Sequence, residues 1–271
     1  MKLFIFSLFF FICSFSSSVF ADRVGFQDKS SAWQNIKSDH FIVLYKKAPQ
    51  QFVENTLARA EEDYQKTATT LGFTRYKGWI GSSRVKIYIY DDAGAYKNSS
   101  GLGWAAGSVV TRSRTISAYP SASGFFDSTL PHEIGHIILR DFIGTDAVVP
   151  LWFEEGVAMY QEESGRWGAD ADVLRALVEG RFISVEDMSS LELSRDSNVE
   201  LVRIFYAEAA SLVRFLINEG ETYRFARLCR EIKNGSRFDW ALKKSYMKYQ
   251  TLQGLEEDWK DYLGHEKSKK H

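Results

Sequence analysis

Two histidines four residues apart constrain the fold of this 271-residue chain more than any other feature. They begin and end the segment His132–His136, which reads His-Glu-Ile-Gly-His. Apolar residues recur through it at helical spacing, Pro131 suits a first helical turn, and Gly144 marks a stop. Residues four apart on a helix share one face, so both imidazoles can reach one tetrahedral metal ion. The pattern predicts a helix over residues 128–142, with Ser128 as its N-cap.

Two glutamates complete the motif. Glu133 follows the first histidine and can sit beside a metal-bound water without being a ligand, as in zinc peptidases with this motif. Eighteen residues separate His136 from Glu155, which has the spacing of a third ligand, and Glu154 is the alternative. A helix with two surface histidines and a solvated carboxylate would leave the same short motif. The inference of a metal site therefore depends largely on the segment around Glu155.

The two segments, Leu-Pro-His-Glu-x-x-His and Pro-x-Trp-x-x-Glu-Gly-x-Ala, resemble the peptidase MA-like group of gluzincins, relatives of M1 aminopeptidases and thermolysin. The resemblance implies a zincin-like α+β fold and one Zn²⁺ per chain, held by His132, His136 and Glu155. It also implies that Glu133 acts as general base on a water activated by the metal, in the hydrolysis of a peptide or protein substrate. The placement of Glu-Gly favours Glu155 over Glu154.

The resemblance continues into a helix that begins near Tyr206 and into a closing segment at residues 241–259. It implies that Tyr206 donates a hydrogen bond to the oxyanion, although an apolar anchor with a satisfied hydroxyl is an equal alternative and Tyr160 a weaker candidate. The strand expected at Ala105–Val110 stands where related enzymes have an edge strand that pairs with extended substrate.

One position departs from the pattern. Relatives often carry an acidic residue four positions after the ligand glutamate, hydrogen-bonded to a zinc-bound histidine, and this chain has Met159 there. We expect Asp141, Asp146 or a backbone carbonyl to orient the histidine instead. The departure also supports an alternative function, that of a catalytically weak or inactive zincin-fold protein that binds peptides or cell-envelope partners.

Periodicity predicts a sheet lobe at residues 22–126 and a helical lobe at 127–263, with the zinc site at their junction. We expect strands at residues 40–45, 84–90, 104–110 and 115–119, and helices at 51–71, 128–142, 151–163, 170–179, 199–219, 223–233, 238–246 and 255–263. The tail at 264–271 is expected to be disordered.

Residues 1–21 read as a secretory signal peptide, with Lys2, a short apolar run and small residues before Ala21. Lipidation at Cys13 is the weaker alternative. The expected location is therefore periplasmic or extracellular. Later segments lack an apolar run long enough to span a bilayer, so no stable span is expected once the signal is removed.

Composition excludes little. The formal net charge of −1 predicts no basic field for nucleic acid or anionic lipid. Signal removal would leave Cys229 as the only cysteine, which we expect to be a buried core residue without a disulfide. Asp170 and Asp172 stand at the start of a predicted helix, where we expect them to complement the helix dipole rather than to bind calcium.

Overall fold

A computed structural model describes residues 33–73, 78–100, 107–110, 114–120, 122–162, 165–194 and 196–269. The expected signal peptide and Cys13 lie outside these residues, as do residues 104–106 of the expected edge strand. In the described part of the chain, no helix is both long and apolar enough to cross a membrane.

The described strands form one mixed, five-stranded sheet in the order β1-β2-β3-β5-β4. The strands are β1 (Gln34–Lys37), β2 (Phe41–Tyr45), β3 (Val85–Ile89), β4 (Gly107–Val110) and β5 (Thr115–Ala118). The three central strands are parallel, whereas β1 and β4 pair antiparallel at the two edges. Val43, Ile87 and Ile116 are paired across the centre of the sheet and are fully buried, so the apolar alternation of these strands sets the register.

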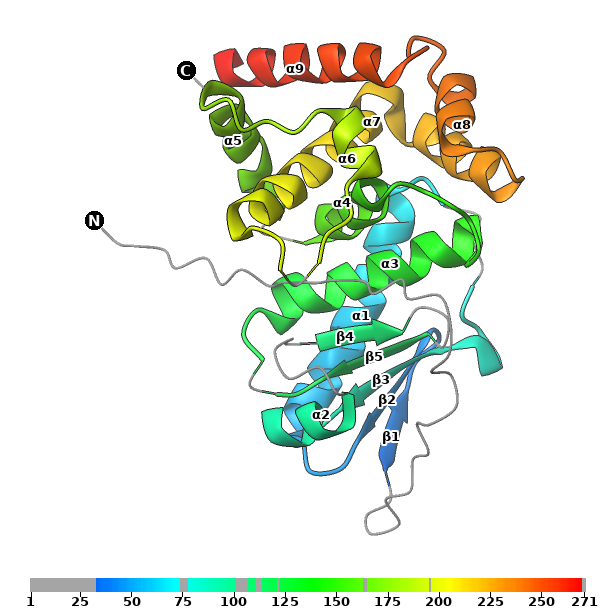
Figure 1. The fold of residues 1–271 in the computed structure, drawn as a ribbon. Coiled ribbons are helices and arrows are strands. Elements are labelled where there is room, and N and C mark those ends of the chain that lie inside the picture. The colour runs from blue at the N-terminus through cyan, green and yellow to red at the C-terminus, as the bar shows by residue number, and fades with distance from the viewer. Residues whose placement is uncertain are drawn as a thin grey trace.

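Helices make up most of the remaining chain (Figure 1). They are α1 (Gln50–Thr70), α2 (Ala93–Ser100), α3 (Leu130–Ile143), α4 (Leu151–Gln161), α5 (Gly165–Val178), α6 (Val185–Ser190), α7 (Val199–Lys233), α8 (Phe238–Ser245) and α9 (Leu252–Lys269). Helix α1 links β2 to β3, and α3 lies between the sheet lobe and the helices above it (Figure 1). The structure is therefore α+β with a zincin-like plan, as predicted.

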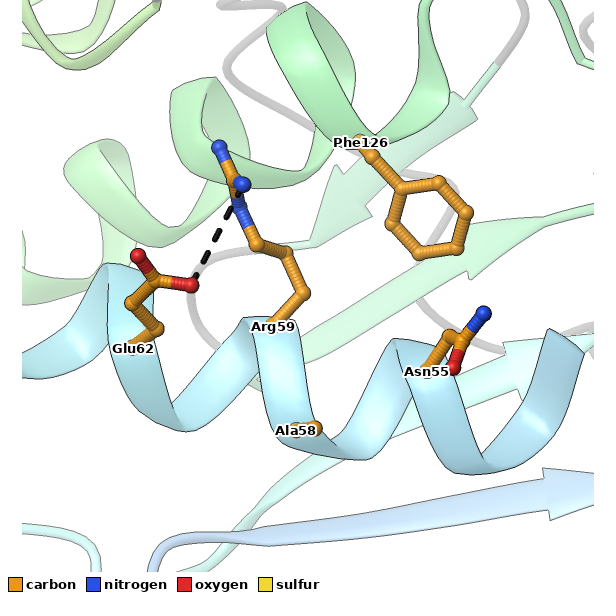
Figure 2. Close-up of a pocket in the computed structure, with 5 residues that line it drawn as sticks. All are labelled: Asn55, Ala58, Arg59, Glu62 and Phe126. Carbon is orange, nitrogen blue, oxygen red and sulfur yellow. Dashed lines mark ion pairs between the residues drawn. The ribbon is translucent and has the colours of Figure 1, made fainter. Parts of the chain in front are cut away.

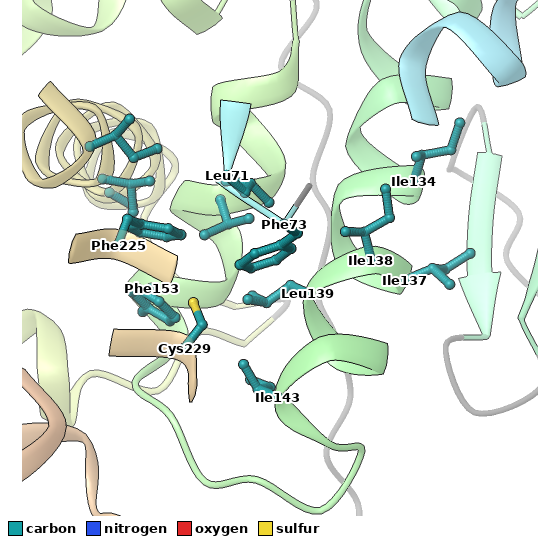
Figure 3. Packing of buried hydrophobic residues seen from close by; sticks show 14 of the residues in the cluster. Leu71, Phe73, Ile134, Ile137, Ile138, Leu139, Ile143, Phe153, Phe225 and Cys229 are labelled. Carbon is teal, nitrogen blue, oxygen red and sulfur yellow. The ribbon is translucent and has the colours of Figure 1, made fainter. Parts of the chain in front are cut away.

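Helix α3 belongs to the cores of both lobes. It contacts α1 and β4 on the sheet side and α4 and α7 on the other side. Leu139 and Ile143 point toward Phe153 of α4 and Cys229 of α7 (Figure 3). The expectation that Cys229 is a buried core residue is confirmed, because its side chain is fully buried.

Gly156 lets α4 approach α7 closely. A Cβ atom at this position would lie 2.6 Å from the Val213 side chain and would also collide with the Ala209 carbonyl. Only glycine fits without a shift of one helix, so the Glu-Gly pair of the motif has a packing reason as well as a chemical one.

Two polar roles predicted near helix starts were wrong. Ser128 does not cap α3, because a π-helical turn at Phe125–Thr129 runs directly into that helix, and the Ser128 hydroxyl bonds to Glu162 instead. Helix α5 begins at Gly165, which places Asp170 inside the helix. Its buried carboxylate accepts a hydrogen bond from Ser211 at 2.7 Å and pairs with Arg214.

Other differences concern element boundaries. The two helices expected at 199–219 and 223–233 form α7, which is broken at Glu221 by a non-helical backbone (φ 53°, ψ 164°). Helix α9 continues to Lys269 and takes in most of the segment expected to be disordered. Strand β1 and the short helices α2 and α6 were not predicted, because each is too short to show a clear period.

Candidate metal centre

Two helices bring the three predicted ligands together. His132 and His136 lie one turn apart on α3, and their Nε2 atoms are 3.1 Å apart. Helix α4 places Oε2 of Glu155 at 3.8 Å from each of these nitrogens. The three side chains are almost fully buried, with 6%, 1% and 1% exposure for His132, His136 and Glu155. They form a cluster that can hold a metal ion.

The spacing of these atoms fits zinc. Nε2 of His132, Nε2 of His136 and Oε2 of Glu155 form a triangle with sides of 3.1, 3.8 and 3.8 Å. The point in the plane of these three atoms that is equidistant from them lies about 2.1 Å from each. Zinc lies roughly 2.0–2.2 Å from imidazole nitrogen and carboxylate oxygen in proteins. Two neutral imidazoles and one carboxylate are also a ligand set that leaves a fourth position for water, as in catalytic zinc sites.

Buried carboxylate oxygens without hydrogen-bond partners also indicate a metal site. Glu133 is fully buried, yet among the described residues neither its carboxylate oxygens nor those of Glu155 have a hydrogen-bond partner. A buried carboxylate without partners is costly, and a cation offsets that cost. The cluster is thus better explained as a metal site than as a packing feature.

Glu162 orients the first histidine. Nδ1 of His132 donates a hydrogen bond to Oε1 of Glu162 over 2.7 Å, and the hydroxyl of Ser128 donates to the other oxygen. With its proton on Nδ1, the ring presents the bare Nε2 to the cluster. Glu162 is the first residue after α4, and it follows Glu155 by seven positions, about two helical turns, so it lies near the same side at the end of the helix. This spacing is the sequence signal that would have identified Glu162.

Glu154 and Glu155 have different partners in the structure. Nε of the buried Arg140 donates to Oε1 of Glu154 over 2.7 Å, and its Nη2 pairs with the second carboxylate oxygen. Glu154 therefore serves as the partner of a buried guanidinium. Its Oε1 also lies 3.8 Å from Nδ1 of His136, so a carboxylate faces each histidine on the side away from the cluster.

Burial and mutual charge shift the pKa values of the cluster. Burial lowers the pKa of His132, but the hydrogen bond and charge of Glu162, with those of Glu155 and Glu133, raise it to about 9. Burial raises the pKa of Glu133 and of Glu155 to about 8, against the opposing effect of His132. Burial, then the positive charges of His132 and Arg140, hold the pKa of His136 well below its usual value.

The other residues predicted to belong to the site either have different partners or have roles that stay predictions. Asp141 does not orient a histidine, because its carboxylate accepts hydrogen bonds from Trp79 (2.5 Å) and Arg114 (3.1 Å). Tyr206 is half-buried on α7, where its ring contacts Phe205, and its catalytic role remains a prediction. Strand β4 lies at the sheet edge, as predicted, and it contacts α3. Its pairing with substrate stays a prediction.

The pocket in Figure 2 has a volume of about 390 Å³. It is lined by α1 residues and Phe126, and Arg59 crosses it to pair with Glu62 at 4.0 Å (Figure 2). None of the cluster residues lines it, so it contributes nothing to the case for a metal site.

The fold and the buried cluster define a zincin-like protein with a candidate metal centre. The comparison with protein families agrees, since the family model described as the peptidase MA superfamily matches residues 69–265, most of the chain. The chain therefore belongs to the peptidase MA superfamily, and this membership supports a peptidase-like function. A comparison with curated proteins gives no significant match.

The buried charges make the stability of the metal-free protein depend on pH. Glu133 and Glu155 have folded-state pKa values of about 8 against 4.5 unfolded, and His132 has about 9 against 6.5. The folded state thus binds more protons above pH 6.5, and its stability falls as pH rises. Below pH 6.5 the lowered pKa of His136 gives the opposite slope.

We expect the free energy of unfolding in excess chelator to fall as pH rises from 6.5, by up to about 1.4 kcal/mol per pH unit for each such group, until about pH 8 for Glu133 and Glu155 and about pH 9 for His132. Urea denaturation at a series of pH values measures it. The Glu133→Gln variant should show a shallower decline, and an equally steep decline in that variant would contradict the assignment.

Glu162→Gln should lower zinc affinity about 10- to 100-fold, because partners that orient a ligating histidine typically contribute that much. Competition with a chromophoric chelator measures the dissociation constant. Glu186→Gln, which removes an exposed carboxylate at the start of α6, is the control and should bind zinc like the wild type. Equal affinities for the two variants would show that Glu162 does not support the site.

Proposed function

We propose that the protein is a zinc-dependent peptidase. The observation that carries the proposal is the buried triangle of His132, His136 and Glu155, with Glu133 as a fourth buried group beside it. Membership of the peptidase MA superfamily supports the same activity. The expectation that the protein acts outside the cytoplasm rests on residues 1–21 and stays a prediction.

The residues around the triangle have separate roles in this proposal. Zinc, when bound, supplies a Lewis acid that lowers the pKa of a coordinated water and polarises the substrate carbonyl. Glu133 accepts a proton from the attacking water and delivers it to the amine nitrogen as the peptide bond breaks. Glu162 holds His132 in the tautomer and orientation that bind metal. A divalent cation at the cluster favours the ionised form of Glu133 that the first step needs.

Glu162 also weakens the argument for an inactive binding protein. That alternative followed from Met159, which removes the acidic residue expected to orient a histidine. The hydrogen bond of 2.7 Å between His132 and Glu162 supplies the missing carboxylate from a position three residues later. The acidic group is therefore present, but it stands on the residue that follows α4 instead of in the last turn of that helix.

Glu133→Gln should reduce hydrolysis of a mixed peptide library at least about 10²- to 10⁴-fold, because the amide cannot accept the proton. Zinc content, measured by elemental analysis, should stay near that of the wild type. Glu186→Gln is the matched control and should keep full activity. Excess chelator should abolish hydrolysis in the wild type, and added zinc should restore it.

Other outcomes of this experiment decide between functions. Wild-type protein that retains zinc but cleaves no library member would favour the binding protein. Cleavage that persists in chelator and in Glu133→Gln would reject the zinc-peptidase mechanism, and a wild type that binds no zinc would reject both metal-dependent functions.

We assign the second oxyanion donor to Tyr206, whose hydroxyl would donate to the developing negative charge. Tyr206→Phe removes only that hydroxyl and should lower kcat about 10²- to 10³-fold with little change in KM. Tyr160→Phe is the control. A normal kcat in Tyr206→Phe, with stability unchanged, would leave Tyr206 as an apolar anchor.

A further inference from the structure

The near-neutral net charge conceals a strongly basic region. Residues 222–250, from the break in α7 to the turn after α8, contain eight of the 34 Lys and Arg residues but only two of the 35 Asp and Glu residues. We call this region the α7–α8 hairpin. Its net charge of +6 is balanced by an acidic excess elsewhere in the chain, so the absence of a basic field predicted from total charge does not hold locally.

Packing fixes the orientation of the hairpin. The inner face of the second half of α7 carries Phe225, Leu228, Cys229 and Ile232, all buried, and Phe225 and Cys229 face the α3–α4 core in Figure 3. The outward positions of the same helix are Tyr223, Arg227 and Arg230, which are exposed. A rigid inner face therefore holds the basic outer face toward solvent.

Helix α8 extends this surface. It buries Phe238, Ala241 and Leu242, and it exposes Trp240 and Lys244. The two helices pack together: Lys244 reaches Glu231 of α7 at 3.0 Å, and the ring of Tyr246, just after α8, packs against Gly220, just before the break in α7. The ion pair between Lys244 and Glu231 joins the outer sides of the two helices.

Acidic residues neutralise only part of this surface. The two acidic residues of the hairpin, Glu231 and Asp239, pair with Lys244 and Arg237. Lys248 pairs with Glu219 and Asp258, which lie outside the hairpin. The exposed Arg227 and Arg230 and the half-buried Lys243 have no hydrogen bond or ion pair with the described residues, although the charge of Arg227 helps to lower the pKa of Glu231. These three cations are available to an external anionic partner.

Apolar side chains stand among these cations. Tyr223 is 54% exposed, Trp240 56% and Met247 77%. Tyr223 and Trp240 are the only large aromatic side chains that are exposed in the described part of the chain. Trp and Tyr prefer the boundary between lipid headgroups and acyl chains, and Lys and Arg on the same surface attract anionic headgroups.

We propose that the outer face of the α7–α8 hairpin docks the protein on the surface of an anionic phospholipid bilayer. The unpaired cations contact headgroup phosphates, while Trp240 and Met247 enter the interfacial layer. A nucleic acid or an acidic protein would satisfy the charge, but neither accounts as well for solvent-exposed Trp and Met beside it. Docking is independent of the proposed peptidase chemistry.

The proposal is tested by cosedimentation with vesicles of phosphatidylcholine alone and of equal parts phosphatidylcholine and phosphatidylglycerol. We expect binding to the anionic vesicles, decreasing as salt is raised. The triple variant Arg227→Gln, Arg230→Gln, Lys243→Gln should bind them on the order of 100-fold more weakly at low salt, about fivefold for each charge. The matched control, Lys47→Gln, Lys86→Gln, Lys97→Gln, removes three exposed cations from the sheet lobe and should bind like the wild type.

Trp240 provides a second measurement. Brominated acyl chains should quench tryptophan fluorescence of the wild type on anionic vesicles, and most of this quenching should disappear in Trp240→Phe. Binding to neutral vesicles that neither triple variant alters would indicate an apolar anchor elsewhere, such as residues 1–21, and would overturn the proposal. So would equal weakening by both triple variants, or a preference for a soluble polyanion such as polyphosphate over anionic vesicles.

Discussion

The burial of four ionisable side chains where α3 meets α4 is the constraint on which the rest of the structure depends. Transfer of carboxylates and imidazoles out of water is unfavourable unless each group gains a partner. Glu155 and Glu133 have no hydrogen-bond partner among the described residues, and a divalent cation held by Glu155 and both histidines would also offset the charge of Glu133. Because such a site does not exist in the unfolded chain, metal binding would add directly to folding stability.

The surrounding charges are arranged so that they do not compete with the cluster. Arg140 could attract Glu155, but Glu154 occupies its guanidinium through two contacts. Glu162 could add a fourth carboxylate, yet its oxygens are taken by His132 and Ser128. Each neighbouring charged group is thus held by another partner, so His132, His136 and Glu155 are the side chains left to bind a metal ion.

Local patterns predicted the ligands well because the relevant spacings are short. Two histidines one turn apart on α3 need only a helix to converge, and the Glu-Gly pair locates Glu155 on the following helix. The sheet and most helices followed from periodicity for the same reason. Ser128 was misassigned because a hydroxyl before a helix suggests a cap, whereas its true partner, Glu162, is 34 residues away. Asp170 was misassigned because its contact with Ser211 spans 41 residues, and no local pattern encodes such pairs.

The break at Glu221 allows α7 to serve two environments with one run of helix. In a continuous helix, successive side chains are separated by a fixed angle around the axis. The buried side of such a helix therefore shifts gradually along its length and cannot change direction abruptly. Before the break, residues 207–217 are buried on nearly all sides, with only Arg214 half-buried, as in a central helix, and after the break only one stripe is buried. The break resets the phase, so residues past Glu221 can change without altering which side chains of the first half face α4. The surface of the hairpin is thereby free to diverge in sequence while the metal site keeps its packing.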